Sequence, residues 1–164
     1  MTVDCHRDMS VPMAESLLSL VRSFFDRDIC ARAAKPLKLG VTLLVQIDET
    51  PFTVTKENGR LDTSEGAPAK PEMSFFVPRA ALDTLLAEKT QDIGEMGVAV
   101  LKLVASQEAA KRITTKVSIG PLDLLLRGYL AVLPLGGPAV MKYLASKGLT
   151  GIGKVKDAIS RMRS

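Results

Sequence analysis

The chain has 164 residues and a formal net charge of +4, and 46% of its residues are hydrophobic while 24% are charged. This length and composition are typical of a globular protein with one sizeable core, and they predict a single domain over residues 1–164. The one histidine, His6, leaves Ser-His-Asp and Cys-His triads without a credible base. Cys5 and Cys30 form no CxxC pair of the kind that binds zinc. We therefore expect a protein that is not an enzyme and has neither a metal nor a cofactor.

A long first helix is predicted from about Pro12 to Ala34. Ser10 is a suitable N-cap, and Pro36 ends the helix. Charged residues precede the first apolar run, so no secretory signal is visible and a cytoplasmic protein is expected. The apolar positions at helical spacing are Leu17, Leu18, Val21, Phe24, Phe25 and Ile29.

Several short strands follow this helix. Val41–Ile47 is rich in β-branched and other apolar residues, and Pro51–Lys56 alternates apolar with polar residues. The Asn-Gly dipeptide at 58–59 predicts a two-residue hairpin turn, with Arg60–Ser64 as the returning strand. A loop rich in Gly, Pro and Ala then leads into a short buried strand, Met73–Val77.

Two more helices and a strand come next. Pro78 opens a helix with an apolar stripe, and residues 91–106 are predicted to be helical as well. Arg112–Ile119 alternates apolar and polar residues, as a half-buried strand does. Together the elements predict an α+β fold in which a mixed or antiparallel sheet of about five strands is covered by helices.

The segment from Pro121 to Leu135 is apolar on nearly every side of the helix that it predicts. A surface helix normally has a single apolar stripe. Asp123, Arg127 and Pro134 interrupt the segment, and a membrane span needs about 20 mostly apolar residues. Two interpretations remain: a central core helix, or one wall of a pocket for an apolar molecule. Exposing its leucines together would be costly, because burying one contributes about 1.5 to 3 kcal/mol.

The C-terminal end is basic, and residues 136–164 are predicted to form a helical extension of a core at residues 12–135. Residues 141–164 contain six basic residues and one acid. Such an end attracts phosphate, either of an anionic membrane or of nucleic acid, although a solvated terminal helix has the same composition. The stretch from Gly151 to Ala158 resembles the turn of helix-hairpin-helix DNA-binding motifs, in which backbone amides contact phosphate.

Two sequence stretches resemble the sterol carrier protein 2 family of lipid-binding domains. They are I-D-E-T-P-F-T-V-T-K-E-N-G-R-L, from Ile47 to Leu61, and M-S-F-F-V-P-R-A-A-L-D-T-L-L-A-E-K, from Met73 to Lys89. The strand Lys111–Ile119 with Gly120 looks like the late strand of that family. The resemblance implies a β-meander followed by a strand and helix beside a ligand tunnel, over residues 12–135.

The apolar helices and the resemblance together predict a non-enzymatic lipid-binding or lipid-transfer protein. Its ligand would be a fatty acid, a phospholipid, a sterol-like molecule or an isoprenoid. The residues expected to line the tunnel are Leu82, Leu85, Leu86, Val98, Leu101, Leu122, Leu125, Leu126, Leu133 and Tyr129, whose hydroxyl is the candidate polar contact. The residues expected to dock on an anionic membrane are Lys142, Lys147, Lys154 and Lys156.

Two other classes of function remain open. The first is a basic nucleic-acid-binding module that uses the turn at residues 148–159. The second is an accessory subunit that packs its apolar helix on a partner protein. Salt dependence separates the first from lipid binding, because binding to phosphates weakens steeply with salt.

Overall fold

The computed structural model describes residues 10–148 and Arg161. Its centre is a five-stranded sheet in the order β3-β2-β1-β4-β5. All neighbours are antiparallel except β1 and β4, which are parallel, so the sheet is mixed. The predicted α+β class with about five strands is thereby confirmed. The strands are β1 (Thr42–Ile47), β2 (Thr50–Glu57), β3 (Arg60–Glu65), β4 (Met73–Val77) and β5 (Thr114–Val117).

The hairpin between β2 and β3 forms where the Asn-Gly dipeptide predicts it. Asn58 has φ 42° and Gly59 has φ 79°. Positive φ at both central residues is what a two-residue type I′ hairpin turn requires. Glu57 pairs with Arg60 across the turn. Strand β5 is shorter than the strand predicted over Arg112–Ile119, because only Thr114–Val117 pair with β4, at residues 73–76.

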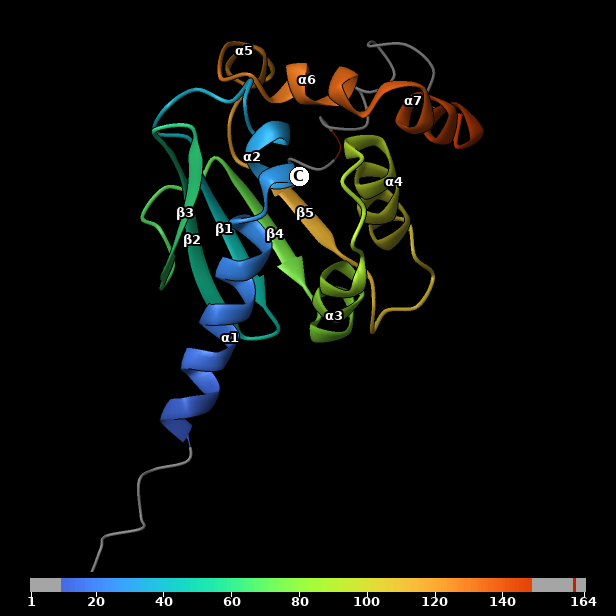
Figure 1. Cartoon of the computed structure of the whole chain (residues 1–164). Coiled ribbons are helices and arrows are strands. Elements are labelled where there is room, and N and C mark those ends of the chain that lie inside the picture. The colour runs from blue at the N-terminus through green and yellow to red at the C-terminus, as the bar shows by residue number, and fades with distance from the viewer. Residues whose placement is uncertain (1–9, 149–160, 162–164) are drawn as a thin grey trace, which may run out of the picture.

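One face of the sheet carries the hydrophobic core. Alternate residues of β1 are buried, and Phe52 and Val54 of β2 are inaccessible to solvent. Helices α1 (Ser10–Phe25), α2 (Asp28–Ala33), α3 (Arg79–Ala87) and α4 (Ile93–Val104) supply the other side of this core. Figure 1 shows α1 and α2 in front of the sheet, and α3 and α4 beside its β5 end.

The predicted single helix from Pro12 to Ala34 is wrong in one respect: it is broken between α1 and α2. Arg27 is extended at the break, with φ −61° and ψ 143°. Its guanidinium donates hydrogen bonds to the carbonyl oxygens of Leu85, Leu86 and Glu88, at distances of 2.8 to 3.2 Å. A cation at a helix C-terminus also interacts favourably with the helix dipole. The chain therefore leaves the helical path where Arg27 caps the end of α3.

The predicted continuous helix from Pro121 to Leu135 is also wrong. It is divided into α5 (Pro121–Leu126), α6 (Tyr129–Val132) and the 3-10 turn η1 (Leu133–Gly136), and α7 (Gly137–Ser146) follows. Gly128 has φ 91°, and a Cβ atom there would lie 2.0 Å from the carbonyl oxygen of Pro36. Only glycine allows this backbone approach. We call residues 121–148 the C-terminal arm, which crosses the top of the molecule in Figure 1.

We predict that Arg27→Gln lowers the free energy of unfolding by about 1.5 to 3 kcal/mol, because three carbonyls at the end of α3 lose a charged donor. Urea denaturation measures this effect. The matched control is Arg79→Gln, which removes an exposed pair with Asp83 that is worth about 0 to 1 kcal/mol. Equal losses in the two variants would contradict the capping role of Arg27.

Candidate ligand-binding pocket

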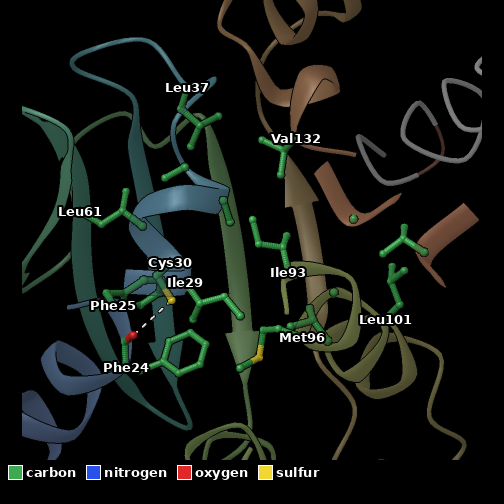
Figure 2. A pocket seen from close by; sticks show the side chains of 16 residues that line it. Phe24, Phe25, Ile29, Cys30, Leu37, Leu61, Ile93, Met96, Leu101 and Val132 are labelled. Atoms are coloured by element: carbon green, nitrogen blue, oxygen red, sulfur yellow. Dashed lines mark hydrogen bonds between the residues drawn. The ribbon is translucent and has the colours of Figure 1, made fainter. Parts of the chain in front are cut away.

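An apolar cavity of about 330 Å³ lies between the helices of the body and the C-terminal arm. Helices α1 and α2 form one wall, α4 forms the opposite wall, and the arm adds residues from α6, η1 and α7 (Figure 2). The volume is at the lower end of the range for small-molecule pockets, about 300 to 1,000 Å³. The lining residues are Phe24, Phe25, Ile29, Cys30, Ala33, Ala34, Leu37, Leu61, Ile93, Met96, Gly97, Val100, Leu101, Val132, Gly136 and Val140.

The cavity wall contains no charged side chain among these lining residues. Its one titratable side chain is Cys30, whose thiol donates a hydrogen bond to the carbonyl oxygen of Phe24 at 3.2 Å. Burial raises the pKa of the Cys30 thiol to about 11, and the nearby charge of Arg27 opposes this only in part. Because the thiolate is the nucleophile, Cys30 is unreactive near neutral pH. The lining residues favour an apolar ligand, and none of them is suited to acid-base chemistry near neutral pH.

Glycines bring the arm close enough to α4 to complete the wall. A Cβ atom on Gly94 would lie 2.5 Å from the carbonyl oxygen of Gly136, and one on Gly97 would lie 2.9 Å from a methyl carbon of Val140. Both distances are shorter than a real Cβ contact allows. The two glycines lie three residues apart, on the side of α4 that packs against α7.

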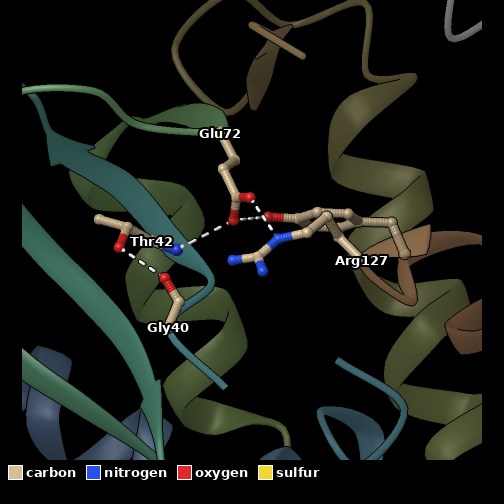
Figure 3. A network of polar contacts seen from close by, with 5 residues as sticks. Gly40, Thr42, Glu72 and Arg127 are labelled. Atoms are coloured by element: carbon tan, nitrogen blue, oxygen red, sulfur yellow. Dashed lines mark hydrogen bonds and ion pairs between the residues drawn. The ribbon is translucent and has the colours of Figure 1, made fainter. Parts of the chain in front are cut away.

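A carboxylate fastens the other end of the arm to the sheet. Glu72, directly before β4, accepts hydrogen bonds from Arg127 Nε at 2.7 Å, from the Tyr129 hydroxyl at 3.0 Å and from the backbone amide of Thr42 at 3.1 Å (Figure 3). The backbone joins in, because the amide of Lys38 donates to the carbonyl oxygen of Arg127 at 3.1 Å. We call Glu72, Arg127 and Tyr129 the Glu72 anchor.

The electrostatics of the Glu72 anchor keep Tyr129 and Arg127 in fixed protonation states. Burial raises the pKa of Tyr129, and the negative charge of Glu72 and the hydrogen bond to it raise it further. The hydrogen bond to Glu72 also raises the pKa of Arg127. The tyrosine therefore remains a neutral donor and the arginine a cation at any physiological pH.

The residues that line the pocket differ from most of those expected from the sequence. Leu101 lines it. Leu82 and Leu85 are buried in the core between α3 and the sheet, Leu86 packs partly buried against that core, and Val98 is partly buried outside the lining set. Periodicity identifies an apolar helix face but not which of several apolar faces borders a cavity.

The arm holds the remaining expected residues, and several of them point away from the pocket. Leu122, Leu125 and Leu126 were expected to line the tunnel, but all three are exposed on α5 and none of them lines the cavity. The break at Gly128 leaves α5 with one inward leucine, Leu124. Tyr129 uses its hydroxyl in the Glu72 anchor. The side chain of Leu133 lies outside the described part of the structure.

Of the four lysines predicted to dock on a membrane, two lie in the described part of the chain and two do not. Lys142 and Lys147 are exposed on α7 and at its end. Lys154 and Lys156 lie outside the described residues, as does nearly all of the proposed DNA-binding turn at 148–159.

Sequence reasoning missed the small residues that shape the pocket. Glycine weakens a helix, but the spacing of Gly94 and Gly97 places both on one side of α4, where a neighbouring segment can approach closely. Gly136 in the arm, which faces Gly94, is the matching small residue that a sequence search for this close approach could have used. Cys30 is a free, buried cysteine, and its raised pKa makes it an unreactive thiol.

These features define an α+β protein with an apolar pocket between a sheet-backed body and a C-terminal arm. Within residues 10–148 and 161, no group of three or more His, Cys, Asp or Glu side chains is placed to hold a metal ion. Of the helices in that same part of the chain, none has the length and apolar character needed to cross a bilayer.

No protein-family model matches the chain, and no curated protein matches its sequence. Among solved structures, one described as "UbiJ-SCP2 Ubiquinone synthesis protein" is similar to it, with a TM-score of 0.42 and 15% sequence identity. The match covers 78% of this chain and 93% of that one. At this TM-score and identity, neither the ligand nor the activity of one protein transfers to the other.

We predict that Tyr129→Phe lowers the free energy of unfolding by about 1.5 to 3 kcal/mol, because a partly buried carboxylate loses one donor. The same variant keeps the affinity of the wild-type protein for a fluorescent fatty acid, because the hydroxyl faces Glu72 and not the pocket. Urea denaturation and a fluorescence titration measure the two effects. Weakened fatty-acid binding at unchanged stability would place the hydroxyl in the ligand site instead.

Proposed function

We propose that the protein is a non-enzymatic binder and carrier of an apolar chain molecule, such as a fatty acid or an isoprenoid. The observation that carries the proposal is the cavity of about 330 Å³ with an apolar wall. An apolar cavity of this kind binds ligands by shape and apolar area, with few polar contacts to fix their orientation. Its volume favours a single chain over a phospholipid with two chains.

The chemistry of the wall supports a binding role over a catalytic one. Cys30 is its one titratable side chain and carries a pKa of about 11, so it is a protonated thiol near neutral pH. A catalytic cysteine requires a lowered pKa and a nearby base. With no charged partner on the wall for a ligand headgroup, the headgroup of a fatty acid would lie at the mouth of the pocket, in water.

The basic part of the arm supports a second element of the proposal. Lys142 and Lys147 are exposed, and such residues are attracted to anionic membrane surfaces by about 1 kcal/mol each. They would steer the carrier toward a bilayer from which an apolar chain is collected. A cytoplasmic location remains a prediction from the sequence.

Filling the pocket tests the proposal directly. Ala33 is the last residue of α2 and lines the cavity, so the ring of Ala33→Phe occupies part of the ligand volume. We expect the affinity for a fluorescent fatty acid to fall by about tenfold or more, equivalent to about 1.4 kcal/mol. A fluorescence titration at constant protein concentration measures it.

The matched control is Ala87→Phe, the same substitution at the exposed end of α3 and away from the lining residues. It should bind the fatty acid as the wild-type protein does, and circular dichroism should show both variants folded. A folded Ala33→Phe protein with unchanged affinity would contradict binding in this pocket.

A further inference from the structure

Large exposed hydrophobic residues of the described chain gather at one edge of the molecule. Five of the six lie in the C-terminal arm, and the sixth, Leu39, lies in the loop that contacts the arm through Lys38 and Pro36. This edge is the top of Figure 1. The exposed residues and their exposed fractions are Leu39 65%, Leu122 66%, Leu125 54%, Leu126 58%, Leu135 40% and Met141 45%.

Helix α5 directs its leucines outward. Leu122, Leu125 and Leu126 have the i, i+3, i+4 spacing of a single helix face, whereas Leu124 is buried on the opposite side. A surface helix normally buries its apolar stripe and exposes its polar residues. Exposed apolar groups of this size, gathered in one place, mark an interaction site.

We propose that Leu39, Leu122, Leu125 and Leu126, the leucine face, insert into the interfacial layer of an anionic membrane. The charge along this edge is complementary to anionic lipid, with two lysines in the loop that carries Leu39 and two more on and after α7, at the far end of the arm from α5. Exposed lysines in residues 35–40 and in the arm are Lys35, Lys38, Lys142 and Lys147. The acid in these two segments is Asp123, and the charge of Arg127 is neutralised by Glu72. Apolar residues combined with lysines on one edge of a protein are the composition of interfacial membrane-binding elements.

The dimensions of the leucine face also favour a membrane over a second copy of the chain. Helix α5 has six residues and is therefore about 9 Å long. A stable protein interface buries about 800 Å² on each partner, much more than one such helix and a loop residue provide. A bilayer needs no shape complementarity, so a few leucines suffice to anchor there.

Insertion would bring the pocket to the bilayer, a step that rests on the proposed function. The arm that carries the leucine face also supplies Val132, Gly136 and Val140 to the pocket wall. The Glu72 anchor joins α5 and α6 firmly to the sheet. Docking by α5 therefore sets the distance between the membrane surface and the cavity, which suits exchange of an apolar chain.

The test is flotation of the full chain with phosphatidylcholine vesicles, with and without phosphatidylglycerol. We expect binding to the vesicles with phosphatidylglycerol, and a loss of about tenfold or more when three leucines become serine. That variant is Leu122→Ser with Leu125→Ser and Leu126→Ser. Lys38→Glu with Lys142→Glu should weaken binding, whereas Lys111→Glu, in the loop before β5 at the opposite end of the sheet, should not.

A second measurement keeps the proposal testable if the triple variant does not fold. The chain has no tryptophan, so Leu125→Trp introduces a unique fluorophore at an exposed position. Its emission should move to shorter wavelength when vesicles with phosphatidylglycerol are added. Emission that stays unchanged, or a triple variant that binds vesicles like the wild type, would overturn the proposal.

Failure of this inference is distinguishable from failure of the proposed function. The triple serine variant should still bind a fluorescent fatty acid from solution, and the Ala33→Phe variant should still float with vesicles. A wild-type protein that binds no vesicles but forms a dimer through these leucines would replace the membrane with a second copy and overturn the inference.

Discussion

The position of the C-terminal arm depends on one carboxylate. Glu72 accepts from a backbone amide of β1, from an arginine and from a tyrosine, and the latter two belong to the arm. A partly buried carboxylate with three donors is well satisfied, and loss of any donor leaves part of its charge uncompensated. Without this contact, the arm would lose its tie to the sheet, and with it one wall of the pocket.

The pocket lies beneath the arm between two contacts, one near the start of the arm at Arg127 and Tyr129 and one further along at Gly136 and Val140. At one end is the Glu72 anchor, and at the other Gly94 of α4 admits the backbone of η1 and Gly97 admits the Val140 side chain of α7. Between these points, the arm contributes few side chains to the space above α2 and α4. The uncovered apolar wall is the physical basis of the proposed lipid-carrier function, and the outward leucines of α5 result from the same geometry.

Much of the fold was predictable because it follows from local rules. The strand Met73–Val77 and the Asn-Gly hairpin formed as alternation and turn chemistry indicate. The breaks at Arg27 and Gly128 were not predictable, because each depends on a partner distant in sequence: the end of α3 and the carbonyl of Pro36. For the same reason, one residue predicted for the tunnel, Leu101, lines the cavity, whereas the leucines of α5, which were also predicted for it, are exposed.

The central claim is that the apolar cavity holds an apolar molecule. Native mass spectrometry of the purified full chain, followed by solvent extraction of what travels with it, tests this most directly. We expect the wild-type protein to carry one acyl or isoprenoid chain per protein, and the Ala33→Phe variant to carry none. A wild-type protein that is empty as purified and also takes up no added fatty acid would contradict it.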